Sequence, residues 1–251
     1  MSVGRKGYKY LFILFFMVSD KELQEIIDTY NVLVKGISQK AIDNQEGRAY
    51  GGIVRAGKGN MLENIAKTLV ILAWKDLGKD EKRLKIIGTR IKIPIKKEYI
   101  DGLEDKEVKE HILKNIKNYV YPYKSDVLVS IDNKPVFEIE CKAYTENAMM
   151  KRILVDCTLL KRIYPKMKFA LLQLESQLGG DYSELKDKPL GSSSTHTLLS
   201  MFDIDLKIIT LIKGERLVDK PIHKKEYFKP LTKDSLIKAI DDFKEILSEV
   251  I

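Results

Sequence analysis

The chain has 251 residues, of which 44% are hydrophobic, so it can bury a substantial core and is not an intrinsically disordered protein. Its 44 lysines and arginines outnumber 36 aspartates and glutamates, which gives a formal net charge of +8 and suits a polyanionic partner without proving one. Cys141 and Cys157 are too few for a disulfide framework and lack metal-ligand spacing, so reduced, buried thiols in a cytoplasmic protein are expected.

The first residues combine several cations with an apolar run over residues 10–18. A membrane span needs about 20 residues, and no small-residue cleavage site of a signal peptide follows. Instead, Ser19 and Glu22 form the pattern of a capping box at the start of a helix. We therefore predict a single domain over residues 17–251 and treat residues 1–16 as a leader or a mis-called start without assigned function.

Residues 37–59 are polar and rich in glycine, and they carry Arg55 and Lys58. This composition predicts a mobile basic loop. A helix is then expected to begin after Asn60, its N-cap, with Glu63 at the third position completing a capping box.

Residues 84–95 alternate isoleucines with cations, among them Arg90 and Lys92. This pattern predicts a strand with one basic face that lies beside the hairpin described next. Residues 101–120 are highly charged but place their apolar residues on one helical side, which predicts an amphipathic insertion.

Residues 127–131 have the β-rich composition of a strand, and the turn formers at 132–135 lead into a second β-rich run. The pattern predicts a β-hairpin. In its second strand the period of two places Glu138, Glu140 and Lys142 on one face, while the residues between them are apolar and face the core.

The remainder of the chain predicts a helix over 145–163, two strands over 168–174 and 206–212, and a closing helix over 232–250. This order of elements indicates an α/β fold with a central mixed β-sheet flanked by helices on both faces.

The hairpin carries residues suited to phosphodiester hydrolysis. Asp126 opens the first strand and Glu140 lies near the end of the second, so pairing brings both carboxylates to one end of the sheet. Mg²⁺ prefers oxygen ligands and keeps several waters, so two carboxylates and a backbone carbonyl are enough to hold it. Lys142 projects from the same face as Glu140, where an ammonium can orient a water or balance developing negative charge.

The pattern Asp126-x13-Glu140-Cys141-Lys142 resembles the PD-(D/E)xK nuclease superfamily, which places this motif on such a hairpin with a helix directly after it. The resemblance implies a restriction-endonuclease-like core, in which Asp126, Glu140 and the Cys141 carbonyl bind Mg²⁺ and Lys142 is the catalytic lysine. Ser125 stands where the family usually has proline.

Three further polar residues have two interpretations each. Glu63 matches a glutamate on an early helix that joins the site in many members of the superfamily, but it also fits a capping box. Glu138 either binds a second metal or, as we favour, is a solvated charge at a sheet edge. Gln173 either faces the site or is simply polar at a strand end. The candidates for contacts with the DNA backbone are the cations of the glycine-rich segment and of the basic strand: Arg55, Lys58, Arg90 and Lys92.

The leading functional hypothesis is a type II restriction endonuclease, a Mg²⁺-dependent enzyme that cuts double-stranded DNA at a specific short sequence, with a cognate DNA methyltransferase as its genetic partner. The superfamily core is here combined with loops and insertions that can read a sequence. The alternatives are a structure-specific nuclease such as a junction resolvase, and a non-catalytic DNA-binding protein. Because one site attacks one phosphodiester at a time, we expect a homodimer, formed through residues 101–120 or the terminal helix.

Overall fold

The computed structural model describes residues 20–43, 47–87, 90–179 and 191–251, and within these ranges it describes the side chains except those of 37–43, 47–56 and 87. The helices are α1 (Asp20–Asp43), α2 (Gly47–Asp76), α3 (Lys97–Asp101), α4 (Lys106–Lys114), α5 (Asn147–Ile163), α6 (Ser193–Ser200) and α7 (Lys233–Glu249). The strands are β1 (Leu84–Ile87), β2 (Arg90–Pro94), β3 (Val120–Lys124), β4 (Val127–Ile131), β5 (Lys134–Glu146), β6 (Lys168–Gln177) and β7 (Leu206–Thr210).

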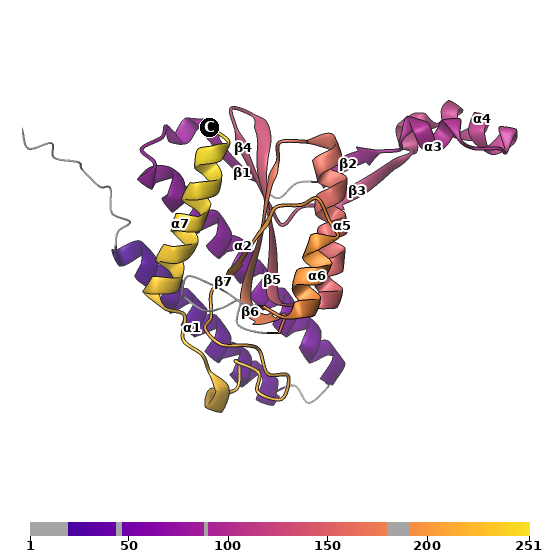
Figure 1. Cartoon of the computed structure of the whole chain (residues 1–251). Helices are drawn as coiled ribbons and strands as arrows, with labels where there is room; N and C mark the ends of the chain where they lie inside the picture. The colour runs from indigo at the N-terminus through magenta and orange to yellow at the C-terminus, as the bar shows by residue number, and fades with distance from the viewer. Residues whose placement is uncertain (1–19, 44–46, 88–89, 180–190) are drawn as a thin grey trace, which may run out of the picture.

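A five-stranded sheet with the order β1-β4-β5-β6-β7 forms the centre of the molecule. β1, β4 and β5 are antiparallel neighbours, whereas β5, β6 and β7 run parallel. α1, α2 and α7 cover one face of this sheet and α5 and α6 cover the other (Figure 1). The predicted α/β fold with a mixed sheet between two layers of helices is confirmed.

The predicted hairpin is β4 and β5, and a two-residue turn joins its strands. Asp132 and Asn133 have φ values of 50° and 65°, in the left-handed region that a two-residue turn of type I′ requires at both central positions. Aspartate and asparagine tolerate this region better than other non-glycine residues. The turn pairs Ile131 with Lys134. A register shift between Val129 and Ser130 then pairs Val127 with Ile139, so Asp126 lies next to Glu140.

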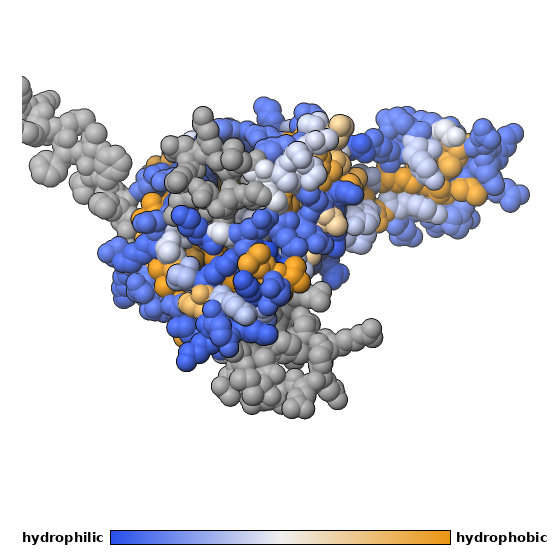
Figure 2. All heavy atoms as spheres, turned by 60° about the horizontal axis from the view of Figure 1, so that its bottom comes forward, coloured by the Kyte–Doolittle hydropathy of each residue, from blue (hydrophilic) through white to orange (hydrophobic). Residues whose placement is uncertain are grey.

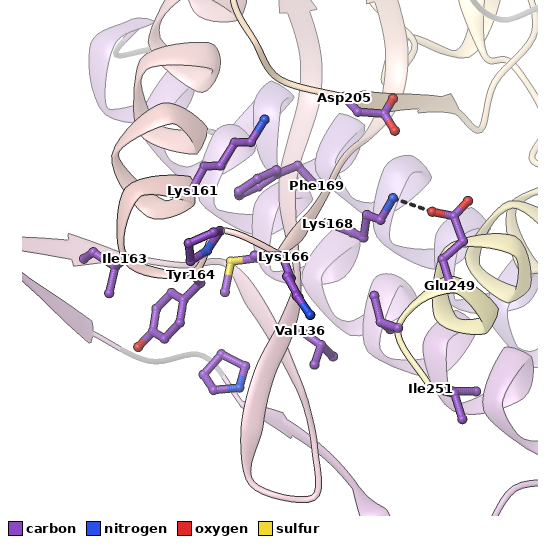
Figure 3. A pocket seen from close by; sticks show the side chains of 14 residues that line it. Val136, Lys161, Ile163, Tyr164, Lys166, Lys168, Phe169, Asp205, Glu249 and Ile251 are labelled. Atoms are coloured by element: carbon purple, nitrogen blue, oxygen red, sulfur yellow. Dashed lines mark ion pairs between the residues drawn. The ribbon is translucent and has the colours of Figure 1, made fainter.

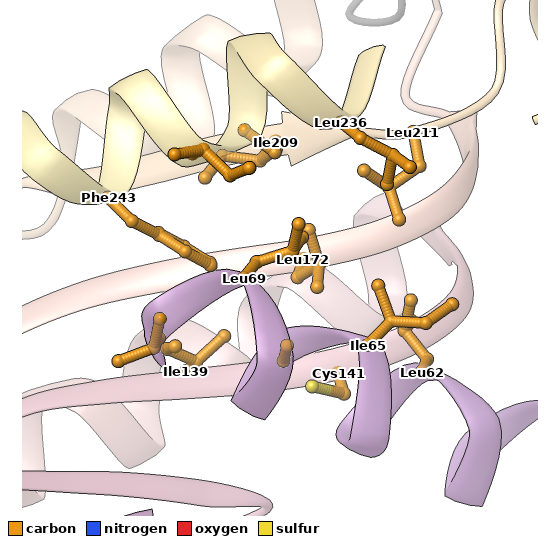
Figure 4. Close-up of a cluster of buried hydrophobic side chains, with 14 of the residues drawn as sticks. Leu62, Ile65, Leu69, Ile139, Cys141, Leu172, Ile209, Leu211, Leu236 and Phe243 are labelled. Atoms are coloured by element: carbon orange, nitrogen blue, oxygen red, sulfur yellow. The ribbon is translucent and has the colours of Figure 1, made fainter. Parts of the chain in front are cut away.

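The apolar face of β5 is buried beneath α2 and α7. Phe137, Ile139 and Cys141 belong to a cluster that also contains side chains of α1, α2, α7 and the neighbouring strands (Figure 4). Phe137 packs edge-on against Phe243 of α7, with ring centroids 5.6 Å apart. Burial of these side chains fixes which face of β5 is turned outward, because a slip of one residue would exchange the two faces.

The opposite face of the sheet packs against α5 and α6. Here Leu128, Phe169 and Leu171 contact the buried side of α5, and Ile91 and Tyr123 from β2 and β3 join the same cluster. This is the face that carries Glu138, Glu140 and Lys142, so the predicted catalytic side chains lie at the border of a second core.

The N-terminal helices correct one prediction. α1 continues to Asp43 and α2 begins at Gly47, so the expected loop over 37–59 is wrong, and Asn60 is an interior residue of α2 rather than its N-cap. The buried second half of α2, from Leu62 to Trp74, stabilises a helix that can lengthen without a new nucleation step. The predicted start of the first helix at Ser19 and the segment 1–16 lie outside the described residues.

The basic strand predicted over 84–95 is divided into two. β1 pairs with β4 beside the hairpin, as predicted, but β2 pairs with β3 in a separate two-stranded ribbon. Pro94 and Pro122 donate no hydrogen bond and are tolerated in this ribbon, where each strand has a free edge. α3 and α4 lie at the end of the ribbon, and residues 90–124, which we call the arm, project away from the sheet (Figure 1).

Candidate active site

Three charged side chains of the hairpin meet at one end of β4 and β5. The Lys142 ammonium donates a hydrogen bond to Glu140 Oε1 and lies 3.5 Å from Asp126 Oδ2. It also donates to the carbonyl oxygen of Cys141, at 3.4 Å. The structure therefore brings together the four residues that the sequence motif singled out.

The backbone of β5 holds Asp126 in place. The Cys141 N–H donates a hydrogen bond to Asp126 Oδ2 at 3.0 Å. Because this donor belongs to a strand buried on its other face, the carboxylate is oriented by the sheet rather than by solvent. Such a support is what a metal-ligating carboxylate needs.

The site lies at the boundary between core and solvent. The side chains of Glu140, Asp126 and Lys142 are 12%, 19% and 29% exposed, so each is mostly buried yet reachable from outside. Burial raises the pKa of Glu140 above its ordinary value, and the Lys142 ammonium only partly offsets this. Burial alone would lower the pKa of Lys142, but the carboxylates of Glu140 and Asp126 outweigh it and raise the pKa, so the lysine is a cation at neutral pH.

The donor set fits a magnesium ion. Oxygens of Asp126, Glu140 and the Cys141 carbonyl already surround one cationic atom, the Lys142 nitrogen. Within the described ranges no three side chains of His, Cys, Asp or Glu gather into a metal site. Two carboxylates and a carbonyl leave the remaining positions to water or substrate, which is how Mg²⁺ is commonly bound.

Glu138 is not the solvated edge charge that we favoured from sequence. It is completely buried, and its Oε1 accepts hydrogen bonds from the hydroxyls of Tyr123 at 2.9 Å and Ser125 at 3.3 Å. Burial raises its pKa well above the ordinary value, and the neighbouring charge of Glu140 adds to this. Ser125, which replaces the usual proline of the motif, thus supports the buried carboxyl group. Tyr123 was not anticipated, because its partner lies in a different part of the sequence.

Gln173 lies beside the site in the interior of β6, so the interpretation as a polar strand end is wrong. Its register partner in β5 is Lys142. The side chain is fully buried, and its Nε2 donates a hydrogen bond to Thr210 Oγ1 at 2.9 Å.

Glu63 is half-buried and lies in the interior of α2 rather than in its first turn, so the capping-box interpretation is wrong. The catalytic interpretation remains a prediction. Among the hydrogen bonds and ion pairs of the described residues, none joins Glu63 to Asp126, Glu140 or Lys142.

A second charged group surrounds Lys58 of α2. Its side chain is 9% exposed, and burial lowers its pKa, with the charges of Glu175 and Arg216 acting in opposite directions. Glu175 forms an ion pair of 2.9 Å with Lys229. The Arg216 guanidinium lies 3.8 Å from the ring centroid of Tyr144, two residues beyond Lys142 on β5. Sequence patterns did not indicate Arg216, because its loop has no periodicity.

The other candidates for DNA contacts are spread out. Arg90 and Lys92 are exposed on the arm. The side chain of Arg55 lies outside the described residues. A DNA-binding role of these cations, including Lys58, remains a prediction.

A pocket of about 900 Å³ lies at the other end of the sheet, where β5 and β6 begin (Figure 3). Val136, Tyr164 and Lys168 line it, and Lys168 forms an ion pair with Glu249 of α7. None of the catalytic candidates Asp126, Glu140 and Lys142 lines this pocket, so the pocket and the predicted chemistry are separate.

A hairpin that presents an aspartate, a glutamate and a lysine beside a mixed sheet, with a helix directly after it, is the arrangement expected from the resemblance to the PD-(D/E)xK nucleases. The comparison with known proteins is more specific. The chain is 48% identical over 236 residues to the type II restriction enzyme DdeI of Desulfomicrobium norvegicum, and the matched region covers 92% of this chain and 98% of the relative. The chain therefore belongs to the type II restriction enzymes.

Two other comparisons add little. No family model matches the chain. Among solved structures, the native BbvCI A2B2 tetramer matches over 92% of this chain and 88% of that chain, with 13% identity and a TM-score of 0.35. This likeness is too weak to support an argument.

The helices in the described ranges are too short or too polar to cross a bilayer.

Proposed function

We propose that this enzyme hydrolyses phosphodiester bonds of double-stranded DNA at a specific short sequence and that the reaction requires Mg²⁺ at the hairpin. The observation that carries this proposal is the convergence of Asp126, Glu140 and the Cys141 carbonyl on a single cationic position. The identity with a type II restriction enzyme supports the DNA substrate.

In the proposed mechanism, Asp126, Glu140 and the carbonyl oxygen of Cys141 hold the metal. When bound, Mg²⁺ polarises the scissile phosphate and lowers the pKa of a coordinated water. The Cys141 N–H keeps Asp126 oriented, and the cationic Lys142 donates hydrogen bonds toward the attacking water or the phosphate oxygens, where negative charge increases in the transition state.

The proposed biological setting follows from the same chemistry. Two strands of a duplex must be cut, whereas the described residues contain one site of this kind, so we infer that two copies of the chain act together. A cell that contains a sequence-specific nuclease must protect its own genome from cleavage. We therefore expect a cognate DNA methyltransferase as a partner in the same cytoplasm.

The test is cleavage of a mixed-sequence plasmid with Mg²⁺, with EDTA, and with the Glu140→Gln variant. We expect discrete fragments with Mg²⁺, none with EDTA, and a single-turnover rate lower by on the order of 10³-fold for Glu140→Gln, because loss of a metal ligand removes several kcal/mol of transition-state stabilisation. Asp219→Asn, at an exposed carboxylate, is the matched control and should cut normally. Cleavage by Glu140→Gln at the normal rate would place the site elsewhere.

A further inference from the structure

Gln173 carries a buried polar atom that the proposed mechanism does not use. Its side chain is fully buried, and within the described residues its Oε1 has no hydrogen-bond partner. A buried amide oxygen without a donor costs free energy, and such atoms are rare in folded proteins. A donor that reaches this oxygen only in another state of the neighbouring site would explain why the acceptor is kept.

The sheet places Gln173 next to Lys142. Gln173 on β6 is the register partner of Lys142 on β5 and of Thr210 on β7. The three residues form a row across neighbouring strands, which lie about 4.8 Å apart, and their side chains share one face of the sheet. Gln173 Nε2 donates a hydrogen bond to Thr210 Oγ1 at 2.9 Å. Because β6 lies between β5 and β7, the amide nitrogen is engaged on the side of β7 and the oxygen is left for the side of β5.

The Lys142 ammonium occupies the position at which a metal would bind. Its acceptors are Glu140 Oε1, Asp126 Oδ2 and the carbonyl oxygen of Cys141, which are the proposed ligands of Mg²⁺. A metal on these oxygens takes these three hydrogen bonds from Lys142 and repels its positive charge. The ammonium then needs another acceptor nearby, and its flexible four-carbon stem allows it to reach one.

We propose that Gln173 is a positioning residue: when the three hairpin oxygens hold Mg²⁺, the Lys142 ammonium donates to Gln173 Oε1 and is kept beside the metal. This inference rests on the proposed function, because it assumes a metal at the hairpin. The amide oxygen takes one of the three donors of the ammonium and leaves two for the attacking water or the phosphate oxygens.

A carboxylate of α5 is the rival acceptor. Burial raises the pKa of Asp156, while the charges of Arg152 and Lys142 lower it, so Asp156 lies within electrostatic range of Lys142. Asp156 is already paired with Arg152, at 3.8 Å, whereas the Gln173 oxygen has no partner in the part of the chain that the structure describes. The unpartnered acceptor gains more from a new donor, so we assign the role to Gln173.

The first experiment is a double-mutant cycle that measures the Mg²⁺ affinity of the free protein by calorimetric titration without DNA. Gln173→Met keeps a side chain of similar length but removes the amide. It should weaken Mg²⁺ binding about 10-fold relative to the parent chain, because the displaced Lys142 ammonium loses its acceptor. In the Lys142→Met background the same substitution should leave the affinity unchanged, since no ammonium has to be moved.

Thr145→Val is the matched control. Thr145 on β5 is also fully buried and has a hydroxyl without a hydrogen-bond partner in the described ranges, but strand alternation places it on the opposite face from Lys142. This variant should bind Mg²⁺ with the parent affinity. All variants should keep the circular dichroism spectrum of the parent chain.

Three results of the cycle would overturn the proposal. The first is a Gln173→Met variant with the parent affinity. The second is an equal loss of affinity with and without Lys142, which would make Gln173 a metal ligand or a purely structural residue. The third is a loss in Asp156→Asn that requires Lys142, together with none in Gln173→Met, which would assign the role to Asp156.

A crystal structure of the parent chain with Mg²⁺ and without DNA tests the same point with no substitution in the core. Lys142 Nζ should lie within about 3.2 Å of Gln173 Oε1. A metal on the hairpin oxygens with this distance beyond about 3.6 Å would overturn the proposal. A parent chain that binds no Mg²⁺ in either experiment would overturn both this inference and the proposed metal requirement, whereas bound Mg²⁺ without the predicted coupling would overturn this inference alone.

Discussion

The β4–β5 hairpin and the β2–β3 ribbon of the arm are both antiparallel pairs of strands, but their charged residues lie in opposite environments. In the hairpin, Lys142 compensates Asp126 and Glu140, and the reverse face of β5 is buried beneath α2 and α7. In the arm, the carboxylates of residues 98–113 form no ion pair within the described residues, and apolar side chains such as Val108 and Leu113 are open to solvent. Figure 2 shows hydrophobic residues at the surface of the arm among hydrophilic ones. The charges of the hairpin compensate one another at the border of the core, whereas the charged residues of the arm face solvent.

This difference predicts unequal costs of removing apolar side chains. Phe137→Ala should lower the free energy of unfolding by about 3–5 kcal/mol, since Phe137 is fully buried against Phe243 and its loss leaves a cavity. Leu113→Ala, in the arm, should change it by no more than about 0.5 kcal/mol. Urea denaturation measures both. Similar losses for the two variants would show that the arm is packed as tightly as the hairpin.

The positive charge of Lys142 in the hairpin should affect the rate of DNA cleavage. Lys142→Met should lower the single-turnover cleavage rate by about 10²–10³-fold, because the cation that faces the developing charge is lost. The Mg²⁺ affinity, measured by calorimetric titration, should not weaken, since Lys142 competes with a metal for the same oxygens. Lys134→Met, at an exposed lysine of the same strand, should cut at the parent rate. Weaker metal binding with an unchanged rate would contradict this role.

The two regions are joined by the hydrogen bond from Tyr123 in β3 to Glu138 in β5. Tyr123→Phe should cost about 1–3 kcal/mol of stability, because it leaves the buried Glu138 carboxyl group without one of its donors. Tyr121→Phe is the control in the same strand: its ring is 55% exposed, and no measurable change is expected. Equal effects in urea denaturation would mean that the arm is not anchored through Glu138.

A smaller effect is the dependence of stability on pH that arises from the half-buried His223. Burial, together with the charges of Lys58 and Lys224, lowers the pKa of His223 below its ordinary value of about 6.5. The unfolded chain therefore binds more protons than the folded one between these two pKa values, so stability falls as pH decreases from about 6.5 through the folded pKa.

His223→Gln should flatten the dependence of the unfolding midpoint on pH in this window. Lys58→Met should narrow the window, because one of the charges that lower the pKa is gone. A parent protein whose midpoint does not change between pH 7.5 and pH 5, or a His223→Gln variant with an unchanged slope, would contradict the assignment.

The sequence by itself predicted the hairpin and the grouping of its charged residues. The period of two placed Glu140 and Lys142 on one face, and the turn residues Asp132 and Asn133 joined the two strands into a hairpin. These relations are local: strand alternation and turn geometry act over a few residues, so the pattern is legible without the rest of the fold. The register shift between Val129 and Ser130, which brings Asp126 beside Glu140, was not predicted from the pattern.

Other features were decided by tertiary structure. Glycines between 47 and 59 favoured a loop, but α2 continues through them because its buried second half supports the helix. Glu138 was expected in solvent, but Tyr123 from the arm covers it. In the arm, the strands pair with each other rather than with the central sheet. In each case the deciding contact joins residues that are distant in sequence, and the free energy of burying them outweighs the local preference.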